Sequence, residues 1–127
     1  MNKLGNKETG AIGEHKASLY LKNHGYKILE RNFRAKTGEI DIIAQKDGVI
    51  AFVEVKTRGR NAVILGREAV TPSKQRKIIK TALYYLSANN VTFLQPRFDV
   101  IEITVKERVK VVHIENAFDG SSYRGFI

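Results

Sequence analysis

The sequence predicts an α/β fold in which helices flank a central, mixed five-stranded sheet. Helix-like periodicity occurs near the N-terminus and again after residue 71, whereas runs rich in Ile, Val and Phe alternate as strands do in the stretches between and beyond. The predicted order is helix, three strands, helix, two strands, which is typical of a sheet covered by helices. The first three strands can form an antiparallel meander, and the helix that follows them allows a parallel crossover to the fourth.

The two predicted helices differ in how clearly they begin. The first covers residues of about 7–23. The second begins at Thr71 and Pro72, because threonine is a good N-cap and proline fits the first helical position. Within the second helix we expect Tyr84 and Tyr85 to pack against the protein rather than to stack on nucleic-acid bases.

The predicted strands are short and bounded by turn residues. They cover residues 26–32, 38–44, 49–57, 97–105 and 109–114. Residues 33–38 are expected to be a basic connection. Residues 58–67, rich in Gly and Arg, are read either as a solvated loop or as a flap beside a phosphate-binding cleft.

Length and composition place the chain among ordinary globular proteins. Its 127 residues suit one domain, expected over residues 1–118 and followed by a flexible tail over 119–127. The chain has no long apolar run and no signal-peptide pattern, so we expect a cytoplasmic protein that does not enter a membrane. Cysteine is absent, which excludes disulfides and thiolate metal sites.

The charge balance favours a polyanionic partner. The chain carries 22 Lys and Arg against 13 Asp and Glu, for a net charge of +9. Nucleic acid is the first partner that such a balance indicates, and a basic protein without such a partner is the alternative.

A predicted β-hairpin over residues 38–57 holds the strongest functional signal. Asp47-Gly48 suits a two-residue type I′ turn, in which both central residues need positive φ. This turn sets a register that pairs Lys46 with Val49, Ala44 with Ala51, Ile42 with Val53, Asp41 with Glu54 and Glu39 with Lys56. Because side chains alternate along a strand, one face carries Glu39, Asp41, Ile43, Phe52, Glu54 and Lys56, and the other carries Ile40, Ile42, Val53 and Val55.

Two carboxylates on facing positions need a reason, since like charges there are destabilising. A shared proton, a neighbouring cation or a bound metal would each supply one. Carboxylate oxygens suit Mg²⁺ or Mn²⁺, and Lys56 points to the same spot as Glu54 because two residues separate them. Alternatively, Glu39 and Lys56 form a simple ion pair while Asp41 and Glu54 extend into water.

Glu14 and Gln75 are further candidates, one on each helix. Glu14 falls inside the apolar stripe of the first helix, where a carboxylate is unusual and marks a functional candidate. It could instead sit at the edge of the stripe and reach solvent, or pair with a basic residue. Gln75 falls on the apolar stripe of the second helix.

Five segments together carry a family resemblance. They are Gly13-Glu14, Arg31-Asn32, Gly38-Glu39-Ile40-Asp41, Phe52-Val53-Glu54-Val55-Lys56-Thr57-Arg58 and Arg97-Phe98-Asp99-Val100. In this order they resemble the YraN-like bacterial family (uncharacterised protein family 0102) of the PD-(D/E)xK nuclease superfamily, over residues of about 10–118. That superfamily has a restriction-endonuclease-like core, and the family is distantly similar to archaeal Holliday junction resolvases. The proline of the superfamily motif is replaced here by Ile40.

The resemblance implies a Mg²⁺- or Mn²⁺-dependent endonuclease that hydrolyses phosphodiester bonds of DNA. It implies that Asp41 and Glu54 bind the metal with the Val55 carbonyl, that Glu14 completes the site, and that Lys56 assists the attacking water. Gln75 matches, more loosely, a polar residue near the site in some members. Resolvase-like enzymes act on two strands, so a homodimer is compatible with the resemblance.

Basic residues around this site are expected to hold the nucleic-acid backbone, DNA rather than RNA. They are Arg34, Arg58, Arg60, Arg67, Lys74, Arg76 and Lys77. No base-reading motif is evident, which favours structured or branched DNA over a short sequence site. Two alternatives remain: a non-catalytic nucleic-acid-binding module of the same fold, and an interaction protein whose basic face meets an acidic protein.

Overall fold

The elements follow the predicted order. The structure, a computed structural model, describes residues 6–58, 70–105 and 107–120. Its elements are α1 (Asn6–Asn23), β1 (Lys27–Ala35), β2 (Gly38–Lys46), β3 (Val49–Arg58), α2 (Pro72–Ala88), β4 (Gln95–Val105) and β5 (Val109–Phe118). None of the helices in these ranges is both long and apolar enough to cross a bilayer.

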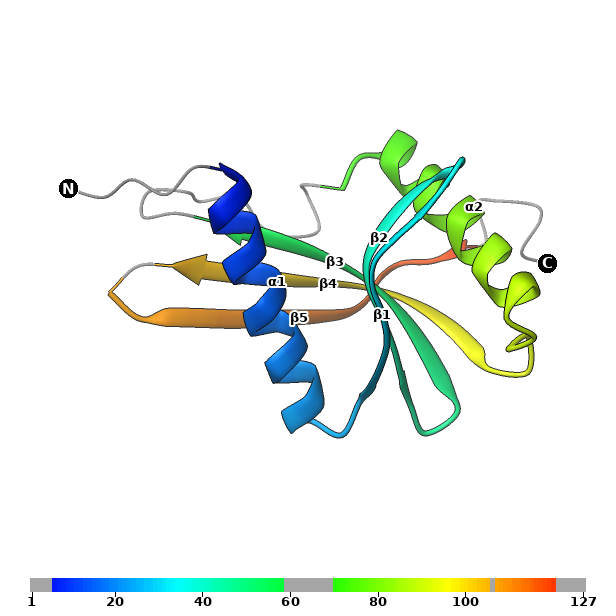
Figure 1. Cartoon of the computed structure of the whole chain (residues 1–127), viewed down its shortest axis with the longest axis horizontal. Coiled ribbons are helices and arrows are strands. Elements are labelled where there is room, and N and C mark those ends of the chain that lie inside the picture. The colour runs from blue at the N-terminus through cyan, green and yellow to red at the C-terminus, as the bar shows by residue number, and fades with distance from the viewer. Residues whose placement is uncertain (1–5, 59–69, 106, 121–127) are drawn as a thin grey trace.

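The five strands form one sheet in sequence order (Figure 1). β3 and β4 run parallel, and every other neighbouring pair runs antiparallel. The connection between the two parallel strands contains α2, and a helix is the usual crossover between parallel strands. The α/β prediction of a mixed five-stranded sheet flanked by helices is thus confirmed, and the arrangement is that of a restriction-endonuclease-like core.

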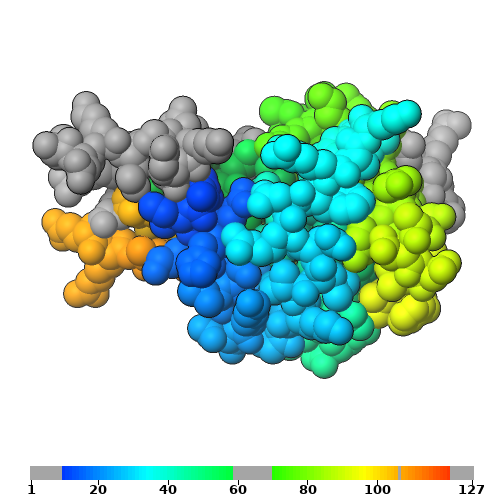
Figure 2. All heavy atoms as spheres, in the orientation of Figure 1, coloured from blue at the N-terminus to red at the C-terminus, as the bar shows by residue number. Residues whose placement is uncertain are grey.

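The two helices cover opposite faces of the sheet. On one face, Ala17 and Leu21 of α1 pack with Ile42, Val53 and Ile101 of the strands. On the other face, residues of α2 pack with a different set of strand side chains, among them Ile43, Phe52 and Phe98. Figure 2 shows the face of the molecule on which α1 lies, next to the β1–β2 hairpin of the sheet.

The β2–β3 turn has the conformation that its sequence predicts. Asp47 has φ of 50° and Gly48 has φ of 80°, so both central residues are in the region that a type I′ turn needs. The pairing follows, with Lys46 opposite Val49 at the turn. Ala44 lies opposite Ala51, and Ile42 lies opposite Val53, as predicted.

The predicted register and alternation fail from Asp41 onward, and Asp41 is not paired with Glu54 in the ladder. The paired residues of β2 and β3 end at Ile42 and Val53, and the Asp41 carboxylate accepts a hydrogen bond from the Val55 N–H at 2.8 Å. Ile40 packs in the α2 cluster, whereas Ile42 packs in the α1 cluster. The expectation that these two isoleucines share a face was wrong. The Asp41 side chain takes the Val55 N–H that a backbone carbonyl of β2 would accept in a regular ladder, so the pairing of β2 with β3 stops here.

The predicted partner of Glu39 was also wrong. Glu39 pairs with Arg34 of β1 in the ladder, and their side chains form an exposed ion pair at 3.2 Å. Lys56 contacts Glu54 instead. The simple ion pair between Glu39 and Lys56 is therefore not formed, since the strand has already departed from β3 at this point.

All five strands are longer than predicted, and the extensions at the ends of β1 and β5 are the largest. β1 continues to Ala35, because Phe33 pairs with Ile40 and packs against the α2 cluster. The basic connection predicted over residues 33–38 is thus mostly strand, and Arg58, predicted to open an irregular stretch, ends β3. β5 continues to Phe118, which pairs with Phe98. Residues 59–67 of the predicted flap and 121–127 of the predicted tail lie outside the described residues.

Candidate active site

A cavity of about 370 Å³ lies where α1, β2, β3 and α2 meet. We call it the acidic cavity. Its lining residues are Gly10, Glu14, Glu39, Asp41, Glu54, Val55, Lys56, Thr57 and Lys74. The structure therefore brings together Glu14, Asp41, Glu54, Val55 and Lys56, which the sequence and the resemblance singled out from one helix and two strands.

Asp41 is held inside this cavity in an environment that disfavours its charge. Its Oδ2 atom accepts the hydrogen bond from Val55, which leaves Oδ1 as the atom that could bind another group. Burial raises the pKa of Asp41 from its ordinary value of 3.8 to about 7, and the charge of Glu54 adds to the rise. A cation placed here would offset both effects.

Glu54 is 7% exposed and is contacted by two lysines. Its Oε1 atom lies 2.7 Å from Nζ of Lys74 and 3.6 Å from Nζ of Lys56. Of the explanations for two neighbouring carboxylates, the structure contains the neighbouring cation, and Lys74 of α2 supplies it. These contacts leave Oε2 of Glu54 as the oxygen that could bind a metal.

The two lysines respond in opposite ways to the same surroundings. Burial, and then the contact with Lys74, lowers the pKa of Lys56. Burial would also lower the pKa of Lys74, but its hydrogen bonds to Glu54 and Lys56 and the charges of Glu54 and Asp41 together outweigh burial and raise it. Lys74 therefore stays protonated more readily, while Lys56 is the lysine that loses its proton more easily.

Glu14 reaches the rim of the cavity because α1 approaches β3 closely. A Cβ atom built on Gly13 would lie 1.8 Å from Oγ1 of Thr57, so only glycine fits between helix and strand. The next residue, Glu14, is half-buried, and its charge contributes to the raised pKa of Asp41. Glu14 is thus neither fully buried in the stripe nor directed away from the cavity.

Gln75 lies elsewhere. Its side-chain amide donates to the Val70 carbonyl at 3.0 Å, and it is not among the residues that line the acidic cavity. Lys74 takes the corresponding place. The sequence pointed to Lys74 as a phosphate contact only, because its ion pair with Glu54 depends on how α2 is placed against β3.

The basic residues predicted to contact nucleic acid are divided by the structure. Arg34 is exposed beside Glu39. Arg58 is half-buried, with Nε 4.0 Å from Glu102, and so faces its own chain. Arg60 and Arg67 lie outside the described residues.

The remaining basic candidates lie on the first turns of α2. The helix has Thr71 as its N-cap, whose Oγ1 accepts from the Lys74 N–H at 3.2 Å. Arg76 and Lys77 are exposed. A hollow of about 320 Å³, which we call the α2 hollow, is lined by Gly38, Glu39, Thr71, Ser73, Lys74, Lys77 and Ile78. Lys74 and Glu39 line both cavities, so the α2 hollow adjoins the acidic cavity.

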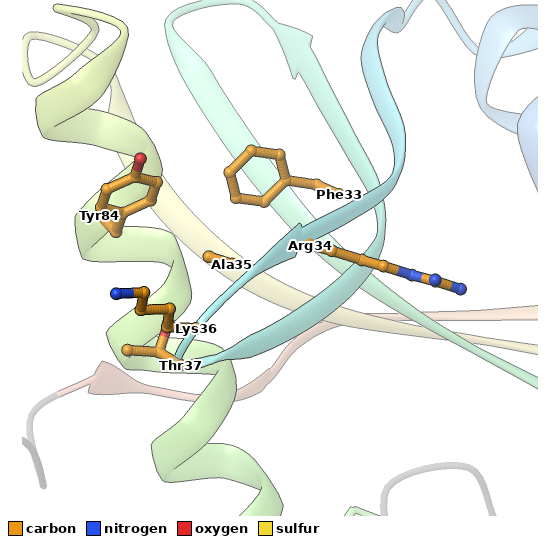
Figure 3. A pocket seen from close by; sticks show the side chains of 6 residues that line it. All are labelled: Phe33, Arg34, Ala35, Lys36, Thr37 and Tyr84. Carbon is orange, nitrogen blue, oxygen red and sulfur yellow. The ribbon is translucent and has the colours of Figure 1, made fainter.

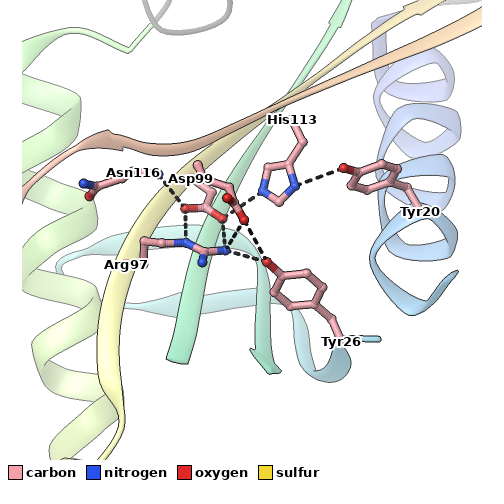
Figure 4. Close-up of polar contacts among 7 residues, drawn as sticks. Tyr20, Tyr26, Arg97, Asp99, His113 and Asn116 are labelled. Carbon is pink, nitrogen blue, oxygen red and sulfur yellow. Dashed lines mark hydrogen bonds and ion pairs between the residues drawn. The ribbon is translucent and has the colours of Figure 1, made fainter. Parts of the chain in front are cut away.

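A second polar cluster lies between α1 and strands β4 and β5 (Figure 4). Asp99 is fully buried, and Arg97 contacts both of its carboxylate oxygens at 2.8 and 2.7 Å. His113 lies 2.8 Å from the same carboxylate and 3.3 Å from the Tyr20 hydroxyl of α1. Burial alone would raise the pKa of Asp99, but the hydrogen bonds from His113 and Arg97 lower it. The carboxylate therefore stays charged and ties α1 to the sheet.

The fold and the acidic cavity define a restriction-endonuclease-like α/β protein with a carboxylate–lysine site at one edge of its parallel strand pair. More particularly, the chain belongs to uncharacterised protein family UPF0102, whose family model matches residues 13–103. The predicted YraN-like membership is thereby confirmed.

Relatives within this family are similar over most of their length. A UPF0102 protein of Caldanaerobacter subterraneus subsp. tengcongensis is 48% identical over 122 residues, which cover 93% of this chain and 100% of the relative. One from Persephonella marina is 48% identical over 87% of this chain and 92% of the relative. One from Clostridioides difficile is 47% identical over 91% of this chain and 100% of the relative.

Proposed function

We propose that the protein is a divalent-metal-dependent endonuclease that hydrolyses phosphodiester bonds of DNA, with structured or branched DNA as its substrate. The observation that carries the proposal is the acidic cavity, where Glu14, Asp41, Glu54 and Lys56 meet from three elements. A carboxylate with a pKa raised to about 7, beside a lysine with a lowered pKa, is typical of a functional site.

The donor set fits a hard divalent cation. Within the described residues no three acidic, histidine or cysteine side chains gather closely enough to hold a metal between them. Magnesium, however, is often held by one or two carboxylates, with water and substrate phosphate completing its shell. Asp41 and Glu54 would hold it with the Val55 carbonyl, and Glu14 would act from the rim. When bound, such an ion neutralises charge on the phosphate and lowers the pKa of bound water.

The lysines act on the substrate side of the same cavity. Lys56 lies within 3.6 Å of Glu54 and is half-buried, so its ammonium stays within reach of a phosphate or water between the two carboxylates. We assign Lys56 to orienting the water and stabilising charge on the phosphate. Lys74 extends the positive charge along α2, where a helix N-terminus without acidic residues in its first turn also attracts phosphate.

A non-catalytic nucleic-acid-binding module of the same fold is the second candidate function. The ion pair between Lys74 and Glu54 favours it, because a lysine at 2.7 Å already balances the most buried carboxylate of the cavity. In that case the basic face of α2 would bind the DNA backbone and no bond would be cut.

A cleavage panel separates the two functions. Linear duplex, single-stranded, flapped and four-way junction DNA would be incubated with Mg²⁺, with Mn²⁺ and with EDTA. The nuclease reading expects metal-dependent cutting of at least one form, and a loss of at least about 100-fold in Asp41→Ala and in Lys56→Ala. Binding in EDTA should persist in Asp41→Ala.

Two exposed substitutions serve as controls, Asp47→Asn in the β2–β3 turn and Lys22→Ala at the end of α1. Both should cut like the wild type. If the wild type binds DNA but cuts none of these DNA forms with either metal, the binding module is the correct function.

A further inference from the structure

A third hollow, of about 550 Å³, lies between the end of β1 and the middle of α2 (Figure 3). Its lining residues are Phe33, Arg34, Ala35, Lys36, Thr37 and Tyr84. We call it the aromatic hollow. Its volume falls within the range of about 300–1,000 Å³ that is usual for small-ligand sites. None of the functions discussed so far uses it.

Two aromatic rings form the walls of this hollow. Their centroids are 6.3 Å apart and their planes differ by 27°, so the rings are close to parallel. Phe33 is backed by Tyr85 in an edge-on contact at 5.1 Å and is thereby fixed on the core. Tyr84 is instead 56% exposed. The expectation that both tyrosines pack against the protein is confirmed for the buried Tyr85, whereas Tyr84 contacts the protein through Phe33 and leaves more than half of its surface exposed.

An exposed tyrosine held beside a fixed phenylalanine can serve as a stacking surface for a base. Figure 3 shows the two rings side by side, and their centroids are 6.3 Å apart. Because Tyr84 is 56% exposed, its ring is accessible to a base from solvent, while Phe33 supports it from the core side.

Positive charge connects the aromatic hollow to the acidic cavity. Lys74 lines the acidic cavity and the α2 hollow, Lys77 lines the α2 hollow, and Lys36 lines the aromatic hollow. Figure 3 shows Lys36 extending from the β1–β2 turn along α2, below Tyr84. A nucleic-acid strand that leaves the acidic cavity along α2 therefore passes a lysine at each hollow before it reaches the rings of Phe33 and Tyr84.

The β1–β2 turn separates the α2 hollow from the aromatic hollow and is held in place by contacts with α2. Thr37 Oγ1 lies 2.8 Å from Oγ1 of Thr81, which is buried on α2. Gly38 would bring a Cβ atom within 3.3 Å of the same Thr81 oxygen. The turn is thus held in place between the two hollows, with Lys36 on the side of the aromatic hollow and Lys77 on the side of the α2 hollow.

We propose that the aromatic hollow binds an unpaired base of a single-stranded nucleic-acid segment whose backbone runs along α2 from the acidic cavity. The base stacks on Tyr84 next to Phe33, and Lys36 and Lys77 contact the phosphates between the acidic cavity and this base. From Lys74 to Tyr84 the helix rises about 15 Å, which corresponds to about four stacked nucleotides. Base–aromatic stacking with a basic track is the usual mode of single-strand binding. The base site rests on the proposed function, since the strand it holds is the one that enters the cavity.

The test measures binding without metal, so that it does not depend on cleavage. Three fluorescein-labelled probes would be titrated in EDTA by anisotropy: a single-stranded oligonucleotide, the same backbone carrying abasic residues, and the corresponding duplex. Tyr84→Ala is expected to weaken single-strand binding by roughly 10- to 100-fold and to leave the abasic and duplex affinities unchanged. Tyr84→Phe keeps the ring and should bind like the wild type.

Phe93→Ala is the matched control, because Phe93 is 78% exposed and lies outside the hollow. It should bind all three probes like the wild type. Single-strand affinity within twofold of the wild type in Tyr84→Ala would overturn the proposal. So would an equal loss on the abasic probe, or a change in sedimentation without a change in single-strand binding, which would mark the hollow as a protein interface.

The failures of the two proposals are distinguishable. Binding through Tyr84 without cleavage of any probe in Mg²⁺ or Mn²⁺ would refute the nuclease and keep the base site. Metal-dependent cleavage with unchanged single-strand binding in Tyr84→Ala would refute the base site and keep the nuclease.

Discussion

Replacing Asp41 by Asn should make the protein more stable at alkaline pH and no more stable at acid pH. The asparagine side chain keeps an oxygen that can accept the hydrogen bond from Val55, while it removes the ionisable group. In the wild type the folded protein holds the Asp41 proton up to about pH 7, whereas the ordinary carboxyl releases it near 3.8. The unfolding free energy of the wild type therefore falls as the pH rises through this window.

The pKa values set an upper bound on the effect. A rise in pKa from 3.8 to about 7, at about 1.4 kcal/mol for each pH unit, corresponds to at most about 4 kcal/mol. Relaxation of the cavity and the nearby Lys74 reduce this value, so we expect Asp41→Asn to gain about 2–4 kcal/mol over the wild type at pH 8. Near pH 4 the two proteins should have similar stability.

Urea unfolding followed by circular dichroism, at pH 4, 5, 6, 7 and 8 in EDTA, measures this difference. Asp47→Asn is the control, since it makes the same chemical change at an exposed turn position whose positive φ asparagine tolerates. Adding Mg²⁺ at pH 8 should stabilise the wild type and not Asp41→Asn. A difference between Asp41→Asn and the wild type that stays constant from pH 4 to pH 8 would refute the assignment of a strained carboxylate to this cavity.

Two further substitutions test how α1 is attached. Gly13→Ala should lower the free energy of unfolding in urea by about 1–3 kcal/mol, because its Cβ would lie 1.8 Å from Thr57 Oγ1. Gly10→Ala is the control and should be neutral or stabilising, because a Cβ there has nothing within 4 Å. Equal effects of the two substitutions would contradict the close approach of α1 to β3. Asp99→Asn should cost about 3–5 kcal/mol because it leaves buried partners without their counter-charge, and a loss below 1 kcal/mol at pH 7 would mean that the buried cluster adds little.

Much of the sheet followed from local pattern. The Asp47-Gly48 turn and the apolar alternation on both sides of it set the register of β2 on β3, as the pairing of Ile42 with Val53 shows. The extension of β1 was missed because Asn32, with φ of 53°, interrupts the regular strand. Phe33 then resumes it only because α2 offers a surface to pack on. That packing is tertiary and leaves no local signal.

The candidate site was predictable where one element carried the information. Asp41, Glu54 and Lys56 came from strand periodicity, and Glu14 came from its place in a helical stripe. The sequence did not show whether Gln75 or Lys74 lies beside the carboxylates, because successive helical residues point about 100° apart. Which of them meets Glu54 depends on the rotation of α2 against β3, and the apolar stripe alone did not set that rotation closely enough.

The placement of Glu14 depends on contacts that lie away from it. Near the cavity, α1 touches β3 through Gly13 and Thr57. Two helical turns later, about 10 Å along the axis, Tyr20 contacts His113, which in turn contacts the buried Asp99. Two attachments on one face prevent the helix from sliding and from turning about its axis. Glu14 directly follows the first attachment, so its distance from Asp41 depends on Gly13 and on the polar cluster around Asp99. Substitutions at either attachment should therefore change the geometry of the acidic cavity.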